Sequence, residues 1–113
     1  MIRLFASDMD GTILQDHSTI HPDNIKMVHY LQEKNIPFVI CSGRDFYQAS
    51  LCLEPANIQC PVIGLNGAVI YKEDGTILKE VTLSHEDTRN LVQKIEKHHN
   101  NWDIMTSKGL FSL

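Results

Sequence analysis

The chain has 113 residues, a length typical of one domain of about 100 to 150 residues. Hydrophobic residues make up 42% and charged residues 21%, as in ordinary soluble domains, which excludes disordered, collagen-like and coiled-coil chains. Ten basic and fourteen acidic residues give a net charge of −4, which argues against a nucleic-acid or anionic-membrane partner. Apolar runs are much shorter than the roughly 20 residues of a membrane helix, and no signal peptide is visible, so we expect a cytoplasmic protein.

Three short apolar runs alternate with two helical patterns in the first part of the chain. The runs are Ile2–Ser7, Pro37–Cys41 and Pro61–Leu65, and the expected helices span Pro22–Lys34 and Asp45–Leu53. Strands that alternate with helices favour an α/β fold with a Rossmann-like parallel sheet. Ligands of such sheets gather at the carboxyl ends of the strands.

The pattern changes after the third apolar run. Ala68–Tyr71 and Thr76–Leu83 flank an Asp-Gly pair, which predicts a β-hairpin. Ser84 then has the pattern of a helix N-cap, and the helix is expected to reach about His99. Trp102–Met105 indicates the beginning of one more strand.

The chain contains three cysteines, Cys41, Cys52 and Cys60. Their odd number and their spacings of eleven and eight fit neither a disulfide framework nor a zinc knuckle. We therefore expect reduced, partly buried thiols that pack as small hydrophobic groups.

Polar residues and glycines follow all three predicted parallel strands. They are Asp8-Met9-Asp10-Gly11-Thr12, Ser42-Gly43-Arg44 and Asn66-Gly67. Because the carboxyl ends of parallel strands share one edge of a sheet, these segments are expected to meet in one crevice.

The types of these residues indicate phosphate chemistry. Asp8 and Asp10, two residues apart, repel each other unless a cation lies near or a proton is shared, and Mg²⁺ is the natural cation for oxygen ligands. Ser42 and Gly43 offer a hydroxyl and backbone amides to a phosphate. Arg44 adds positive charge, or pairs with Asp45 or with the helix surface.

Purely structural roles are the alternatives. The two aspartates would then form a turn and an N-cap, Ser42 would cap the following helix, and Asn66 would only form a turn before Gly67.

The first segment, Asp8-Met9-Asp10-Gly11-Thr12, resembles the first motif of the haloacid dehalogenase-like (HAD) phosphohydrolases, and Cys41-Ser42-Gly43-Arg44 resembles their second. Leu65-Asn66-Gly67-Ala68 with the following hairpin is similar to the Cof-type branch, which carries an α/β cap between its second and third motifs. The resemblance implies that residues 1–82 form the amino-terminal part of the core and residues 83–113 the start of the cap.

The resemblance also implies roles for these residues. Asp8 would attack phosphorus and form an aspartyl-phosphate, and Asp10 would act as general acid and then general base. Mg²⁺ would be held by the Asp8 carboxylate and the Asp10 backbone carbonyl. Ser42 would bind the transferring phosphoryl group, together with amides around Met9 and Gly43. Thr12, Arg44 and Asn66 are further substrate-site candidates.

The sequence departs from the family pattern after Asn66. It contains neither the family's third-motif lysine after a complete cap nor the acidic fourth motif that completes the Mg²⁺ site, so the chain resembles the amino-terminal portion of a phosphatase of at least about twice this length. The edge of the first strand, which is central in the family, would be unpaired.

Two functions follow as hypotheses. The first is a Mg²⁺-dependent phosphatase of small phosphorylated metabolites, impaired or inactive as this chain. The alternative is a noncatalytic fragment or assembly module that self-associates through the exposed edge of the sheet. A sugar phosphomutase is a third reading, because the same first motif can transfer phosphate between positions of a sugar.

Overall fold

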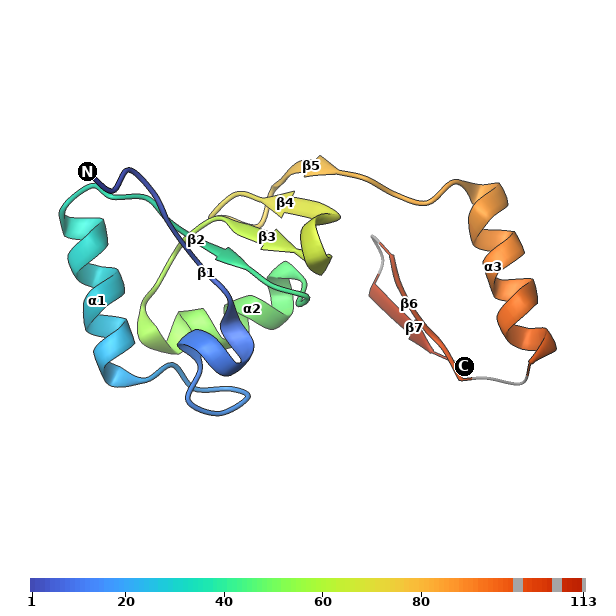
Figure 1. The fold of residues 1–113 in the computed structure, drawn as a ribbon, viewed down its shortest axis with the longest axis horizontal. Coiled ribbons are helices and arrows are strands. Elements are labelled where there is room, and N and C mark those ends of the chain that lie inside the picture. Colours follow the sequence, from blue (N-terminus) through green and yellow to red (C-terminus); the bar gives the residue numbers. More distant parts are fainter. Residues whose placement is uncertain (99–100, 107–108, 113) are drawn as a thin grey trace. The chain divides into compact units, whose positions relative to one another are not determined.

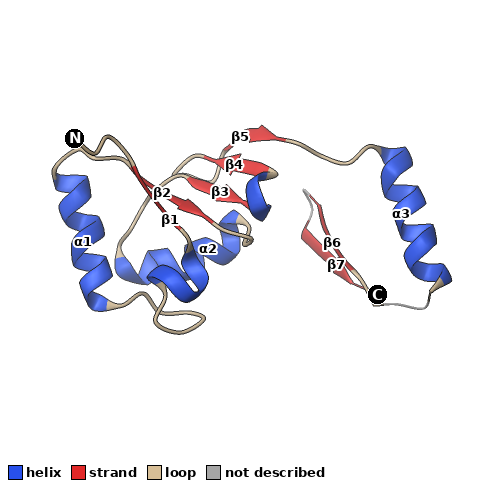
Figure 2. Ribbon diagram, in the orientation of Figure 1, coloured by secondary structure: helices blue, strands red, loops and turns tan. Residues whose placement is uncertain are grey.

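A computed structural model describes residues 1–98, 101–106 and 109–112 of the chain. The chain forms two compact units, Met1–Val81 and Thr82–Leu113 (Figure 1). The first unit contains a five-stranded sheet with helices, and the second contains a helix followed by a two-stranded hairpin (Figure 2).

The first unit is built on a mixed five-stranded sheet with the order β1-β2-β3-β4-β5. Its strands are β1 Phe5–Ser7, β2 Phe38–Cys41, β3 Val62–Gly64, β4 Val69–Tyr71 and β5 Ile77–Glu80. The first three run parallel, with Ser7 opposite Ile40 and Cys41 opposite Ile63. The other two continue the same sheet as an antiparallel hairpin. The predicted parallel sheet followed by a hairpin is therefore confirmed.

Helices α1, Pro22–Glu33, and α2, Phe46–Leu53, form the two crossovers between the parallel strands. Pro22 lies in the first turn of α1, where its missing N–H costs nothing, and the His21 side chain caps this turn. Helix α2 begins one residue later than predicted because Asp45 is its N-cap: the Asp45 carboxylate accepts a hydrogen bond from the Gln48 amide.

The hydrophobic core lies between these elements of the first unit. Met9, Val28, Ile40 and Val62 are its largest completely buried side chains. The apolar runs seen in the sequence are the strands that face this core, since β2 alternates buried and half-buried positions and β3 does the same. Burial of these side chains is what holds the three parallel strands in register.

The hairpin is shorter than the sequence suggested. The turn closes through Lys72, whose amide donates to the Thr76 carbonyl, and Gly75 takes a positive φ of 85° that suits glycine. The predicted second strand, Thr76–Leu83, is reduced to β5, and all four residues of β5 are exposed. Past Glu80 the contact between the two segments is the hydrogen bond of 2.8 Å from the Val81 amide to the Ala68 carbonyl.

The second unit begins with α3, His85–Lys97, capped by the Ser84 hydroxyl, which accepts from the Asp87 amide. The predicted strand Trp102–Met105 is found one residue later as β6, Asp103–Thr106. It pairs with β7, Gly109–Ser112, which the sequence analysis did not predict. His99, the predicted end of the helix, lies outside the described residues.

None of the helices in the described part of the chain has the length and apolar character needed to cross a membrane.

Gly64, the last residue of β3, lies where two segments pass close together. A Cβ atom at this position would lie 2.8 Å from the Arg44 carbonyl oxygen and 3.1 Å from the Tyr71 ring. The first neighbour is backbone, so it cannot rotate away. Gly64 thus allows β3 to approach the loop that follows β2.

We predict that Gly64→Ala lowers the free energy of unfolding by roughly 1–3 kcal/mol, because the added methyl group forces backbone to shift in a packed region. Denaturant unfolding measures the change. The exposed turn substitution Glu73→Ala is the control and should change stability by no more than about 0.5 kcal/mol. Equal stabilities of Gly64→Ala and the parent chain would contradict the close approach.

Candidate active site

The carboxyl ends of the three parallel strands meet at a hollow of about 380 Å³. This volume lies within the range of small-ligand pockets. The residues that line the hollow are Asp8, Cys41, Ser42, Gly43, Ile63, Asn66 and Gly67. They come from the segments that follow β1, β2 and β3, so the predicted convergence of the strand ends is observed.

Asp8 follows β1 directly and is exposed to solvent. Its Oδ1 accepts a hydrogen bond of 2.7 Å from the Met9 amide, whereas no donor among the described residues contacts Oδ2. The Met9 side chain is completely buried and fixes the backbone at this point. Asp8 therefore presents one free carboxylate oxygen beside the hollow.

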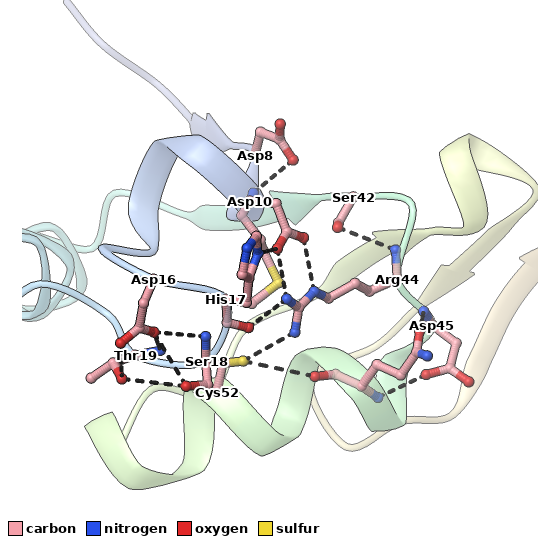
Figure 3. A network of polar contacts seen from close by, with 12 residues as sticks. Asp8, Asp10, Asp16, His17, Ser18, Thr19, Ser42, Arg44, Asp45 and Cys52 are labelled. Atoms are coloured by element: carbon pink, nitrogen blue, oxygen red, sulfur yellow. Dashed lines mark hydrogen bonds and ion pairs between the residues drawn. The ribbon is translucent and has the colours of Figure 1, made fainter.

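Asp10 is held by Arg44, from the loop after β2. Arg44 Nε donates to Asp10 Oδ2 over 2.8 Å and Nη2 donates to Oδ1 over 2.6 Å, a bidentate pair. His17 also lies near this carboxylate, with Nδ1 3.7 Å from Oδ1. Figure 3 shows the Asp10 carboxylate turned toward the guanidinium. Asp10 is not among the residues that line the hollow.

The hydrogen bonds from Arg44 hold the pKa of the Asp10 carboxyl below its ordinary value, and the same pair raises the pKa of Arg44. Both groups are therefore charged at neutral pH. The Asp10 side chain is 44% exposed, so solvent screening limits the contribution of the pair to stability to about 1 kcal/mol or less. The pair matters more for where the carboxylate lies than for folding.

Ser42 is buried, with 7% of its surface exposed. Its amide donates to the Ile63 carbonyl, its carbonyl accepts from the Asn66 amide, and its Oγ accepts from the Arg44 amide. No described residue accepts a hydrogen bond from the hydroxyl itself, which leaves this donor available in the hollow. Because Asp45 caps α2, the alternative in which Ser42 is the helix cap is not what the structure shows.

Gly43 and Asn66 form one wall of the hollow. The Asn66 Oδ1 lies 3.2 Å from the position that a Cβ of Gly43 would occupy, so the two residues are in close contact. Leu65 and Asn66 both have positive φ, 50° and 55°, a conformation that is unfavourable for leucine. The Leu65 amide donates to the Arg44 carbonyl, which helps to hold this turn against the loop after β2.

The structure thus divides the residues predicted from the sequence. Asp8, Ser42, Gly43 and Asn66 line the hollow, and Asp10 and Arg44 pair beside it. The Met9 amide, which the sequence predicts as a phosphate donor, donates to Asp8. The Thr12 side chain is exposed and has no hydrogen bond among the described residues.

Three residues at or near the hollow were not predicted from the sequence. Cys41 is the last residue of β2, next to Ser42, and this position was the available signal. Ile63 lies opposite Cys41 in β3 and lines the hollow through that pairing. His17 lies in a polar loop, which is brought back toward Asp10 by the bridge between Leu14 and Ile20 and by a hydrogen bond from Arg44 to the His17 carbonyl. No local pattern in the sequence indicates that contact.

The sequence profile of the haloacid dehalogenase-like hydrolases matches residues 5–113. The chain therefore belongs to this family, as its motifs indicated.

Curated relatives include phosphatases of several kinds. Phosphatase YwpJ of Bacillus subtilis is 24% identical over 98% of this chain and 39% of its own length. The 5-amino-6-(5-phospho-D-ribitylamino)uracil phosphatase YcsE of Bacillus subtilis is 29% identical over 88% of this chain and 39% of its own length. The phosphoglycolate phosphatase of Thermoplasma volcanium is 30% identical over 96% of this chain and 47% of its own length. The chain thus spans less than half of each.

Solved structures show the same fold. A haloacid dehalogenase-like hydrolase from B. subtilis superposes with a TM-score of 0.88 at 25% identity, over 96% of this chain and 38% of that protein. A protein from Thermotoga maritima superposes with a TM-score of 0.84 at 24% identity, over 99% of this chain and 42% of that protein. The HAD-like α/β fold expected from the motifs is confirmed.

The three cysteines differ in their access to solvent. Cys41 is half-buried at the hollow, whereas Cys52 and Cys60 are buried, and all three are free thiols. Burial raises the pKa of the Cys60 thiol to about 11. At pH 8 only about one Cys60 in a thousand is then the reactive thiolate, and this fraction rises about tenfold per pH unit up to the pKa.

We therefore predict that iodoacetamide at pH 8 alkylates Cys41 well before Cys60, as measured by peptide mass spectrometry over time. Cys41→Ser, the matched control, should remove the fast reaction and leave the slow one unchanged. Earlier alkylation of Cys60 than of Cys41 in the folded chain would contradict the burial of Cys60.

Proposed function

We propose that this chain carries the nucleophile, the acid/base and the first phosphate contacts of a Mg²⁺-dependent phosphatase of small phosphorylated metabolites. The observation that supports this most strongly is the hollow shared by Asp8, Ser42, Gly43 and Asn66 at the ends of β1, β2 and β3. Membership of the haloacid dehalogenase-like hydrolases adds the reaction class. In this proposal phosphate is transferred through an aspartyl-phosphate intermediate.

Asp8 is the proposed nucleophile. The hydrogen bond from the Met9 amide orients its carboxylate, and Oδ2, which has no donor among the described residues, is free to attack phosphorus. Attack forms the Asp8–phosphorus bond and breaks the bond to the leaving oxygen. Ser42 contributes its unused hydroxyl hydrogen, and the Gly43 amide lies at the same wall, so both are suited to contact the transferring phosphoryl group.

Asp10 is the proposed general acid and base. It would give a proton to the leaving oxygen in the first step and take one from the attacking water in the second. The second step breaks the Asp8–phosphorus bond and restores the Asp8 carboxylate. Pairing with Arg44 favours the ionised form of Asp10, which is the form that accepts the proton from water.

The oxygen donors present fit Mg²⁺. The Asp8 carboxylate and the Asp10 backbone carbonyl are the proposed ligands, and Mg²⁺ in such sites takes one or two carboxylates together with water and phosphate oxygens. Within the described residues no cluster of three or more His, Cys, Asp or Glu side chains forms a metal site by itself. When bound, the ion would reduce the repulsion between the anionic substrate and the two carboxylates.

The proposed substrates are small phosphorylated metabolites. Two of the relatives are described as phosphatases of such compounds, phosphoglycolate and a phosphoribitylamino-uracil. The net charge of −4 disfavours a large anionic partner such as nucleic acid, which agrees with a small substrate whose charge is neutralised by a cation.

We predict that the chain releases phosphate from 4-nitrophenyl phosphate in the presence of Mg²⁺, and that Asp8→Asn lowers the rate by at least about a hundredfold because the amide cannot form the phosphorylated intermediate. Phosphate release against time is the measurement. EDTA should abolish it, and excess Mg²⁺ should restore it.

Asp23→Asn, an exposed position in the first turn of α1, is the control and should retain the parent rate. An Asp8→Asn variant as active as the parent would exclude Asp8 as nucleophile. A folded chain without any activity would exclude catalysis by this chain and leave its family membership unchanged.

The second candidate, self-association through the sheet edge, is supported by β1. Among the described strands β1 pairs only with β2, so its other edge carries unpaired backbone groups. Ile2 and Leu4, just before β1, are 62% and 55% exposed. An apolar strand edge of this kind is a template for pairing with a second copy of the chain.

We predict that sedimentation velocity detects a concentration-dependent dimer, and that Leu4→Lys shifts it toward monomer because charge at an edge opposes strand pairing. Leu78→Lys, at an exposed position of β5, is the matched control and should leave the β1-mediated dimer intact. A folded parent chain that stays monomeric at all concentrations would eliminate this candidate.

A further inference from the structure

Arg44 connects three segments of the first unit through its guanidinium. Nε and Nη2 bind the two oxygens of Asp10, in the turn Met9–Ile13. Nη2 also donates to the His17 carbonyl over 2.6 Å, and Nη1 lies 3.3 Å from the Cys52 sulfur in α2. Figure 3 shows these contacts radiating from one side chain. Arg44 is thereby fixed on three sides.

This fixation gives the Asp10 carboxylate a defined orientation. Asp10 lies in a turn with irregular backbone angles, and its side chain is 44% exposed, so packing does not restrain it. The planar fork of Arg44 matches both carboxylate oxygens at once, which fixes direction as well as distance. The Arg44 side chain is only 21% exposed and is the more rigid partner.

We propose that Arg44 is a positioning residue that holds Asp10 in place to accept the proton of the attacking water in the second half of the reaction. This inference rests on the proposed phosphatase function and adds a role for Arg44 to it. In that step water attacks the phosphorus of the Asp8 aspartyl-phosphate, its proton passes to Asp10, and the bond between Asp8 and phosphorus breaks. Inorganic phosphate leaves, and Arg44 itself forms no bond to it.

The alternative role of Arg44 is direct binding of the substrate phosphate. The two roles differ in kinetics with 4-nitrophenyl phosphate, whose leaving group needs no general acid. Formation of the aspartyl-phosphate then proceeds without Asp10, whereas its hydrolysis requires Asp10 as base. A positioning residue affects the second step, and a substrate-binding residue affects the first.

The experiment compares Arg44→Met, Arg44→Lys and Asp10→Asn with the parent chain in rapid-mixing assays. For Arg44→Met we expect kcat to fall about tenfold or more, kcat/KM to change less than about threefold, and a burst of one nitrophenolate per chain to appear. Asp10→Asn should show the same burst with a larger fall in kcat. Arg44→Lys should lie between parent and Arg44→Met, because one ammonium replaces a two-point contact. A rise in KM with a matching fall in kcat/KM, and no burst, would overturn the proposal.

Arg3→Met is the matched control, since Arg3 is exposed and has no ion pair among the described residues. Arg3→Met should have the kcat and KM of the parent chain and, like the parent, should show no burst. If Arg3→Met and Arg44→Met showed the same burst of nitrophenolate, a specific role of Arg44 would be contradicted.

A second measurement is independent of activity. The Arg44 Nε–H signal in a ¹H–¹⁵N spectrum, assigned by its loss in Arg44→Lys, should move on Asp10→Asn because its acceptor changes. If the signal does not move, Arg44 does not hold Asp10 through this hydrogen bond, and the proposal is overturned. If the signal moves but the chain releases no phosphate, the proposed function fails while the holding of Asp10 by Arg44 is supported.

Discussion

Parallel pairing of three short strands is the constraint on which the candidate site depends. With Ser7 opposite Ile40 and Cys41 opposite Ile63, the residues that follow each strand emerge at the same edge. The pairing continues past the strands: the Ser42 amide donates to Ile63, and the Asn66 amide donates back to Ser42. A shift of one residue in this register would turn Ile40 and Val62 out of the core, so burial of the apolar side chains also fixes the polar ones.

The core and the site are therefore produced by the same residues. Met9 illustrates this, because its side chain is completely buried while its amide binds the carboxylate of Asp8. Gly64 has a comparable double role: it ends β3 and permits the close approach of the Arg44 carbonyl. The loops that carry Ser42 and Asn66 are held by backbone hydrogen bonds, and the unfavourable positive φ of Leu65 is offset by this surrounding structure.

Most of the fold of the first unit could be predicted from the sequence, because each parallel strand lies within a short apolar run and each helix has a recognisable start. The site residues followed from one rule, the convergence of strand ends. The length of β5 and the existence of β7 did not follow, because these strands have few buried positions and so leave little apolar pattern. The ion-pair partner of Arg44 could not be predicted from the sequence either, because Asp10 lies 34 positions away whereas Asp45 is adjacent. Asp45 is occupied as the cap of α2, which leaves Arg44 for Asp10.

The two aspartates show how the chain manages like charges at close spacing. By their spacing in the sequence, Asp8 and Asp10 together require a cation or a shared proton. In the structure each has a different partner: Asp10 is paired with Arg44, and Asp8 accepts only from the Met9 amide among the described residues. The Arg44 guanidinium thus balances the charge of Asp10, whereas the charge of Asp8 is left to be balanced by a bound cation such as Mg²⁺. This separation allows two carboxylates two residues apart to serve as nucleophile and as base without competing for the same cation, which is the division of roles that the proposed reaction requires.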